Sequence, residues 1–141
     1  MNLQNNCCAM LKQLHDEIGR RVNNSLRSQN MTFAQMHVLL LLHDAPNHQL
    51  PLKDLEALMH VAQSTAAGIV SRLQKKELVQ ALDDAADQRI KIVQLTESGL
   101  TCCQTANKHI NETEAALLSG LTETEQVIFL TLLKKLRDTV C

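Results

Sequence analysis

Residues 63–76 form the only stretch near the middle of the chain in which several positive charges stand without an acid among them. As a helix, this stretch would have one apolar side and one polar side. The cations of the polar side could neutralise DNA phosphates, and the polar side chains of the first turn could contact base edges or cap the helix. The outward-facing residues are Gln63, Ser64, Thr65, Ser71, Arg72, Lys75 and Lys76.

A second stretch, DDAADQRIKIVQLTESG at residues 83–99, combines three aspartates with Arg89. The alternating residues 90–95 that follow predict a short strand, so the acidic run would be the tip of a hairpin. Thr96 can cap a helix that starts directly after the strand. On these residues alone, Arg89 is either a contact for a partner or a solvated charge that balances the aspartates beside it.

The composition sets the limits for these two stretches. A chain of 141 residues is enough for one domain and short for two. Aromatic residues make up 1%, so the core must be aliphatic, which favours packed helices over a β-sandwich. The formal charge of −1 means that a nucleic acid must be met by a local basic patch. Because the longest apolar run is short and no signal peptide is visible, we expect a cytoplasmic protein that does not enter a membrane.

Helical periodicity and turn residues predict the elements that position both stretches. Leu11, Leu14 and Ile18 belong to one apolar stripe on a long first helix, and Thr32 with Gln35 predicts a capping box at the start of the second. A second capping box is expected at the start of the last helix. The predicted order is a helix over 2–27, a helix over 32–45, a loop, a short helix over 51–61, a helix over 63–76, a hairpin from 78–79 and 90–95, a helix over 96–118, and a helix over 122–140.

Two helices followed by a hairpin are typical of a winged helix-turn-helix, and the sequence resembles one family of that fold. The segments MTFAQMHVLLLL, STAAGIVSRLQKKELV and DQRIKIVQLTESG resemble the MarR family of bacterial transcriptional regulators. The most recognisable signature of the family is matched by Asp87, Arg89, Leu95, Thr96 and Gly99. The resemblance covers essentially the whole chain and implies a mainly α fold with a small β-hairpin wing and a helical dimerisation region.

The resemblance also implies how such a protein would meet DNA. It implies a homodimer in which residues 1–30 and 96–141 supply the interlocking helices and residues 32–95 form the DNA-binding lobe. The dimer would bind a near-palindromic operator, and we expect it to act as a repressor. The arginine would be a reader at the wing tip, oriented by a bidentate pair with an aspartate. The implied DNA contacts are Gln63, Ser64, Thr65, Ser71, Arg72, Lys75, Lys76, Asp87, Arg89 and Lys91.

The chain departs from the family pattern in the reading helix and just beyond it. Ala67 and Gly68 stand where relatives commonly carry an arginine, and Glu77 replaces the glycine of the usual Lys-Gly-Leu turn. We expect Glu77 in a left-handed cap position, which costs about 1 kcal/mol relative to glycine.

The family resemblance places small ligands, often aromatic or phenolic acids, between the dimerisation helices and the reading lobe. Lys12, His15 and Arg20 could supply cationic ends, and Met36 and His37 could line a wall. The alternative is that the two basic side chains are solvated and His37 is packed in the core. No histidine pair has the spacing of a metal site, so we expect no metal and no cofactor.

The cysteines offer a different signal. Cys7, Cys8, Cys102 and Cys103 are candidates for redox sensing, together with Cys141 at the end of the chain. Free cysteines are also common as small buried apolar residues. A second alternative is a winged-helix protein that binds only other proteins. The chain lacks GxSxG, HExxH and a Gly-rich phosphate loop, so we do not expect an enzyme.

Overall fold

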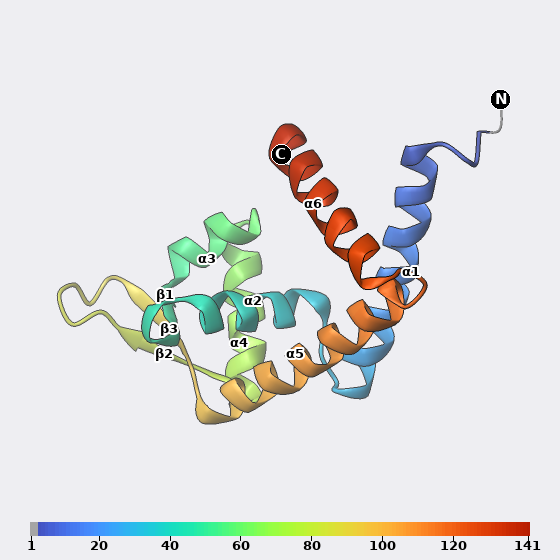
Figure 1. Ribbon diagram of the computed structural model, residues 1–141. Helices are drawn as coiled ribbons and strands as arrows, with labels where there is room; N and C mark the ends of the chain where they lie inside the picture. The colour runs from blue at the N-terminus through green and yellow to red at the C-terminus, as the bar shows by residue number, and fades with distance from the viewer. Residues whose placement is uncertain (1–2) are drawn as a thin grey trace.

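The computed structural model describes residues 3–141 and shows a lobe of short elements attached to an arm of three longer helices (Figure 1). The main difference from the predicted elements is a third strand in the sheet. The elements in chain order are α1 (Cys7–Ser28), α2 (Phe33–Asp44), the 3-10 turn η1 (Pro46–His48), β1 (Gln49–Pro51), α3 (Leu52–Met59), α4 (Gln63–Lys75), β2 (Val79–Asp83), β3 (Lys91–Leu95), α5 (Glu97–Leu118) and α6 (Glu123–Val140).

Helix α2 lies at the centre of the molecule, as its almost continuous apolar sequence predicts. Its side chains Val38, Leu39 and Leu42 are fully buried. They pack against apolar residues of α3, α4, β3 and α5 in one cluster, which includes Leu55 and Leu73. The predicted capping box at its start is confirmed, because the Thr32 side chain accepts from the Gln35 N–H and the Gln35 side chain accepts from the Thr32 N–H.

The wing is a sheet of three strands rather than the predicted two-stranded hairpin. The strand order is β1-β3-β2, and both pairs are antiparallel. The expectation that residues 45–50 form only a loop is wrong, because Gln49 to Pro51 pair with Gln94 to Ile92. Three residues are too few to show strand alternation in a sequence, and Pro51 is tolerated because β1 is an edge strand. The third strand covers the hairpin, which would be marginal alone.

Helices α1, α5 and α6 form the arm. Helix α1 begins at Cys7, later than predicted, because the Asn6 side chain caps it by accepting from the Ala9 N–H. The part of the prediction on residue 2 falls outside the described residues. The predicted capping box of Thr122 and Glu125 is confirmed at the start of α6. Helix α6 projects away from α5 and buries none of its residues (Figure 1).

The helices of the arm give only weak evidence of a membrane span. Among the residues that the structure describes, no single helix is long and apolar enough to cross a membrane. Helices α5 and α6 together pass by length and composition, but they meet at an angle of 109°.

Candidate nucleic-acid interface

Helices α3 and α4 are joined by the short turn of a helix-turn-helix. His60 ends α3 in the left-handed region with φ of 56°, and its N–H donates to the Ala57 carbonyl. The Val61 N–H donates to the Glu56 carbonyl, so the turn is closed by two hydrogen bonds. Because α4 buries the face that carries Ile69 and Leu73, its polar face points away from the core.

The first turn of α4 presents three polar side chains to solvent. Gln63, Ser64 and Thr65 are exposed, and none of them makes a side-chain hydrogen bond within residues 3–141. The N-cap is Ala62, which has no capping side chain. The alternative that these polar residues cap the helix is therefore wrong. Their donors and acceptors are free to bind a partner at the end of α4 that a helix-turn-helix presents to base edges.

The cations near the end of α4 separate into two groups. Arg72 and Lys75 are exposed and have no carboxylate partner among the described residues. Arg72 lies back along the helix, so that its Nη1 is 3.9 Å from the point where a Cβ on Gly68 would stand. It therefore extends toward the position where relatives carry an arginine.

Lys76 behaves differently from its two neighbours. Its Nζ donates to the Asn30 carbonyl and, over 2.9 Å, to Oε1 of Gln35, and it lies 3.6 Å from Sδ of Met31. The expectation that Lys76 projects outward with Arg72 and Lys75 is wrong. Its alkyl chain reaches past the end of α4 and places the ammonium against acceptors of the α1–α2 turn.

The wing tip holds Arg89 as predicted. Its Nε donates to Oδ1 of Asp87 and its Nη2 to Oδ2, each over 3.0 Å, and the Arg89 N–H also donates to Oδ1. These bonds lower the pKa of Asp87 and raise that of Arg89. The Arg89 side chain is 90% exposed, so an oriented guanidinium stands at the surface. Lys91 pairs with Asp83 on the adjacent strand.

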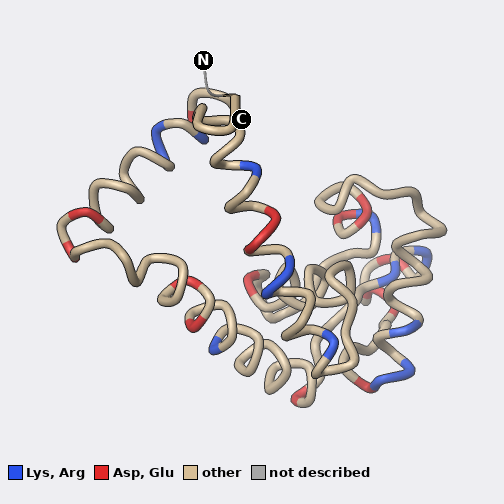
Figure 2. Tube along the Cα trace, turned by 90° about the vertical axis from the view of Figure 1, so that its right-hand side faces the viewer, with Lys and Arg blue, Asp and Glu red and all other residues tan. Residues whose placement is uncertain are grey.

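One hollow brings the wing tip and the helix-turn-helix together. Gln63, Asp87, Arg89 and Lys91 line it from α4 and the wing. Lys53, at the start of α3, also lines it and was not among the predicted site residues. Acidic and basic segments are interspersed over this lobe, and Figure 2 shows the mixture. The charge available to DNA is therefore a few unpaired cations and not a broad basic surface.

Two signature residues, Thr96 and Gly99, fix the wing against the end of α4 together with Glu77. Glu77 has φ of 60°, which confirms the predicted left-handed position. Thr96 Oγ1 donates to the Glu77 carbonyl over 2.7 Å and accepts from the Gly99 N–H over 3.1 Å. The Thr96 N–H donates to the Leu78 carbonyl. These bonds tie β3 and α5 to the end of α4, so the signature combines a contact at the tip with a structural clamp at the base.

Comparison with known proteins agrees with this geometry. The family model described as MarR family matches residues 31–91, from α2 through the wing tip. The HTH-type transcriptional repressor NicR of Pseudomonas putida is 36% identical over 110 residues, which cover 77% of this chain and 68% of NicR. The chain belongs to the MarR family.

Two solved structures share the MarR fold over nearly the whole chain. One is BpsR of Bordetella bronchiseptica, described as regulated in DNA binding by 6-hydroxynicotinic acid, with a TM-score of 0.76, 23% identity and coverage of 98% and 97%. The other is a variant of Escherichia coli MarR complexed with operator DNA, with a TM-score of 0.74, 24% identity and coverage of 96% and 99%. At these identities the structures support the fold. The chain is a winged helix-turn-helix DNA-binding transcriptional regulator. MarR-family regulators are not enzymes, as the sequence led us to expect.

A cavity of about 170 Å³ lies between α1, α2 and α5 of this MarR-family protein. Most of its surface is apolar. The predicted wall residues Met36 and His37 line it, and the His37 ring is 6.1 Å from the Phe33 ring. The sequence did not predict four polar residues at this cavity, which belong to α1, its C-cap and α5. A sequence does not show which faces of two helices meet. The four residues are Ser25, Gln29, His109 and Thr113.

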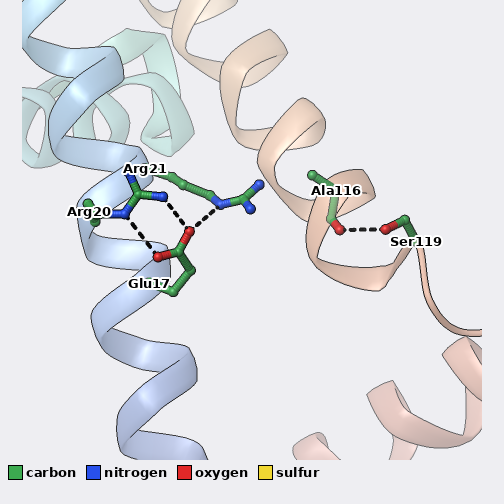
Figure 3. A network of polar contacts seen from close by, with 5 residues as sticks. All are labelled: Glu17, Arg20, Arg21, Ala116 and Ser119. Carbon is green, nitrogen blue, oxygen red and sulfur yellow. Dashed lines mark hydrogen bonds and ion pairs between the residues drawn. The ribbon is translucent and has the colours of Figure 1, made fainter.

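The predicted cationic ends do not line this cavity. Lys12 pairs with Asp16 on the surface of α1, and His15 lies beside the same aspartate. Arg20 donates to both oxygens of Glu17, which also accepts from Arg21 (Figure 3). These two arginines lower the pKa of Glu17 to about 2. The alternative of a solvent-exposed surface network fits these α1 side chains.

The cysteines of the MarR-like core are poorly suited to redox sensing. Cys103 is buried, and its Sγ donates to the Leu39 carbonyl. Burial raises the pKa of Cys103 to about 11 and also raises the pKa of Cys102. Cys7, Cys8 and Cys141 are exposed, and all five cysteines are free.

Within residues 3–141, no cluster of three or more His, Cys, Asp or Glu side chains could hold a metal ion.

Proposed function

We propose that the protein is a homodimeric repressor that binds a near-palindromic operator and is released by a small aromatic or phenolic acid. The first turn of α4, with Gln63, Ser64 and Thr65, would read the major groove. Arg89 would enter the flanking minor groove, where narrow A·T tracts attract cations. The observation that carries this proposal is the guanidinium held by Asp87 at the exposed wing tip, on the same hollow as Gln63.

Dimerisation is supported by the uncovered apolar faces of the arm. Apolar side chains remain exposed along α1 and α6, and Val140 is 81% exposed. A second copy of the chain can cover them through a two-fold axis, which also gives two reading helices for two half-sites. The exposed apolar residues of the arm are Met10, Leu11, Leu14, Ile110, Val127, Ile128, Leu130, Leu132, Leu136 and Val140.

The cavity between α1, α2 and α5 supports the proposed class of effector. Its apolar walls suit a flat ring, and the methionine at position 36 can adapt to the shape of a ligand. His37 and His109 are the titratable side chains of the lining, so either can meet a carboxylate or a phenol. The regulation of BpsR by 6-hydroxynicotinic acid supports an acid of this kind. The name of NicR, a transcriptional repressor, supports repression.

Selection of bound duplexes from a random pool tests the DNA-binding part of the proposal. We expect enrichment of a two-fold symmetric sequence with half-sites about one helical turn apart. Enrichment of no sequence, or of a site without symmetry, would contradict the proposal. The operator found in this way then serves for the ligand experiments.

Titration of the complex with 6-hydroxynicotinic acid and with benzoate tests the release. We expect His37→Ala to weaken ligand binding, measured by calorimetry, with operator affinity unchanged in the absence of ligand. His15→Ala is the matched control, because His15 lies on α1 outside the cavity. Equal effects of the two substitutions would show that the cavity is not the ligand site.

A further inference from the structure

Lys76 joins the end of the reading helix to the turn between α1 and α2. Its ammonium bonds to the Asn30 carbonyl and to Oε1 of Gln35, more than 40 positions away in the sequence, and contacts Met31. The same Gln35 oxygen accepts from the Thr32 N–H in the capping box of α2. The Lys76 side chain therefore binds both Asn30, in the turn after α1, and Gln35, in the first turn of α2.

The α1–α2 turn is short and tightly bonded. Asn30 has φ of 55°, a left-handed position that asparagine tolerates. The Asn30 N–H donates to the Arg27 carbonyl, and the Met31 N–H donates to the Leu26 carbonyl over 2.9 Å. Together with the capping box at the start of α2, these hydrogen bonds join the end of α1 to the start of α2.

The effector cavity borders this turn on both sides. Leu26 and Gln29 line the cavity just before the turn, and Phe33 and Met36 line it just after. A ligand in the cavity would therefore contact residues on both sides of the turn that carries the acceptors of Lys76. Asn30 and Gln35, which accept from Lys76, do not line the cavity themselves, and each is adjacent in the chain to a lining residue, Gln29 and Met36.

The remaining contact between α4 and α2 is made by apolar side chains, and such packing does not depend on a defined bond direction. Ile69, Val70 and Leu73 pack in the core cluster with α2 side chains. Apolar contacts permit small sliding movements, whereas hydrogen bonds require a defined distance and angle. Among the described residues, Lys76 makes every side-chain hydrogen bond that joins residues 63–77 to α1, α2 and the turn between them. No ion pair joins these segments.

We infer that Lys76 is the positioning residue that couples occupation of the cavity between α1, α2 and α5 to the orientation of α4. The inference rests on the proposed release by a ligand. A ligand that separates the ends of α1 and α2 moves the Asn30 carbonyl and the Gln35 amide, and α4 follows through Lys76. Such a ligand releases DNA because it binds more tightly to the state in which the reading helices are wrongly spaced.

A comparison of Lys76→Met with Lys75→Met tests this coupling. Methionine keeps most of the alkyl chain and removes the ammonium, and Lys75 is the exposed neighbour without an internal partner. The quantity measured is the ratio of operator Kd with and without 6-hydroxynicotinic acid, together with the salt dependence of operator binding. Calorimetry of the same acid without DNA reports ligand binding, and thermal melting reports the fold. Lys76→Gln replaces Lys76→Met if the latter does not fold.

For the wild type we expect the acid to raise the operator Kd by at least about fivefold, a common size for allosteric coupling. In Lys76→Met this ratio should fall toward one, while the acid still binds and the salt slope stays unchanged. In Lys75→Met operator binding should weaken with a lower salt slope, and the ratio should match the wild type. Loss of stability alone would change neither the ratio nor the slope.

Two results would overturn the inference and leave the proposed function intact. One is a ratio in Lys76→Met equal to that of the wild type, and the other is a salt slope lowered as in Lys75→Met, which would place Lys76 on phosphates. If the acid does not release the wild type from its operator, both the inference and the proposed release are wrong.

Discussion

The backbone of Gly99 lies directly against the carbonyl oxygen of Leu78: a Cβ on Gly99 would stand 2.2 Å from that oxygen. The carbonyl accepts from the Thr96 N–H, and Thr96 caps α5. This contact lets the start of α5 approach the end of α4, which sets the base of the wing. The last residue of the Leu-Thr-x-x-Gly signature is therefore required by space, since its φ is not in the left-handed region.

Gly99→Ala should destabilise the protein by about 1–3 kcal/mol, because the methyl group forces backbone atoms apart in a packed region. Urea unfolding followed by circular dichroism measures the loss. Gly19→Ala is the control, because no atom lies within 4 Å of a Cβ placed there, and a helical glycine gains about 1 kcal/mol from this change. Unchanged stability of Gly99→Ala would mean that the close contact relaxes without strain.

Arg89→Ala should weaken operator binding by about 1–3 kcal/mol and remove the preference for A·T pairs that flank each half-site. Competition between duplexes with altered flanks measures both effects. Wild-type affinity in a folded Arg89→Ala protein would show that the wing tip is not a reader and that the Asp87 pair only orders a polar hairpin.

The contribution of the Asp87–Arg89 pair should not change with pH in the neutral range. The pKa of Asp87 is lowered by Arg89, so the pair is fully formed above the ordinary pKa of an aspartate and is lost only as the pH falls through the lowered value. Operator titrations of wild type and Arg89→Ala at several pH values measure the difference. If the difference in operator affinity between wild type and Arg89→Ala changes across the neutral pH range, a group other than Asp87 controls Arg89.

Lys75→Ala should weaken binding to all duplexes alike and lower the salt slope by about one unit, as expected of a phosphate contact. Arg72→Ala differs in its expected result, because Arg72 lies back toward Gly68 and the first turn of α4. It should relax the preference at one base pair of each half-site, where arginine favours guanine. A uniform loss for Arg72→Ala would place it with Lys75 on the phosphates.

Leu132→Glu and Leu136→Glu should each shift the protein from dimer to monomer in sedimentation experiments, because both residues are exposed on α6 in one protomer. Operator affinity should fall in the variants that no longer dimerise. Lys135→Glu, a charge change on the same exposed helix, serves as the control and should leave the dimer intact. A wild-type protein that sediments as a monomer at micromolar concentration would contradict the proposed dimer.

The sequence predicted local features well and long-range contacts poorly. The capping boxes at Thr32 and Thr122 follow from residues within a few positions of one another. The bidentate pair at the wing tip and the left-handed Glu77 were implied by the family resemblance, and the structure has both. In contrast, β1 forms only because β3 is available to pair with it. The direction of Lys76 is equally invisible, since its acceptors lie more than 40 residues away.

The cavity shows the same limit. Met36 and His37 were expected at the wall because of the family resemblance, whereas Gln29 at the end of α1 and His109 of α5 reach the cavity through helix packing that depends on the whole fold. Periodicity shows which side of α1 or α5 is apolar, but not which residues of the two helices face each other. Arg20, expected as a cationic end, does not line this cavity, and Glu17, three residues away, binds it.

Peroxide should not release the protein from its operator, and an aromatic acid should. A thiol reacts as the thiolate, and burial raises the pKa values of Cys102 and Cys103, so little thiolate is present at neutral pH. Gel-shift titrations with peroxide and with benzoates should be run on wild type and on a variant with serine at Cys7, Cys8 and Cys141. Cys103 stays in place, because it is 2% exposed and its replacement would disturb the core. Release by peroxide that disappears in the serine variant, with no effect of the acids on either protein, would assign the sensor to the exposed thiols of the arm.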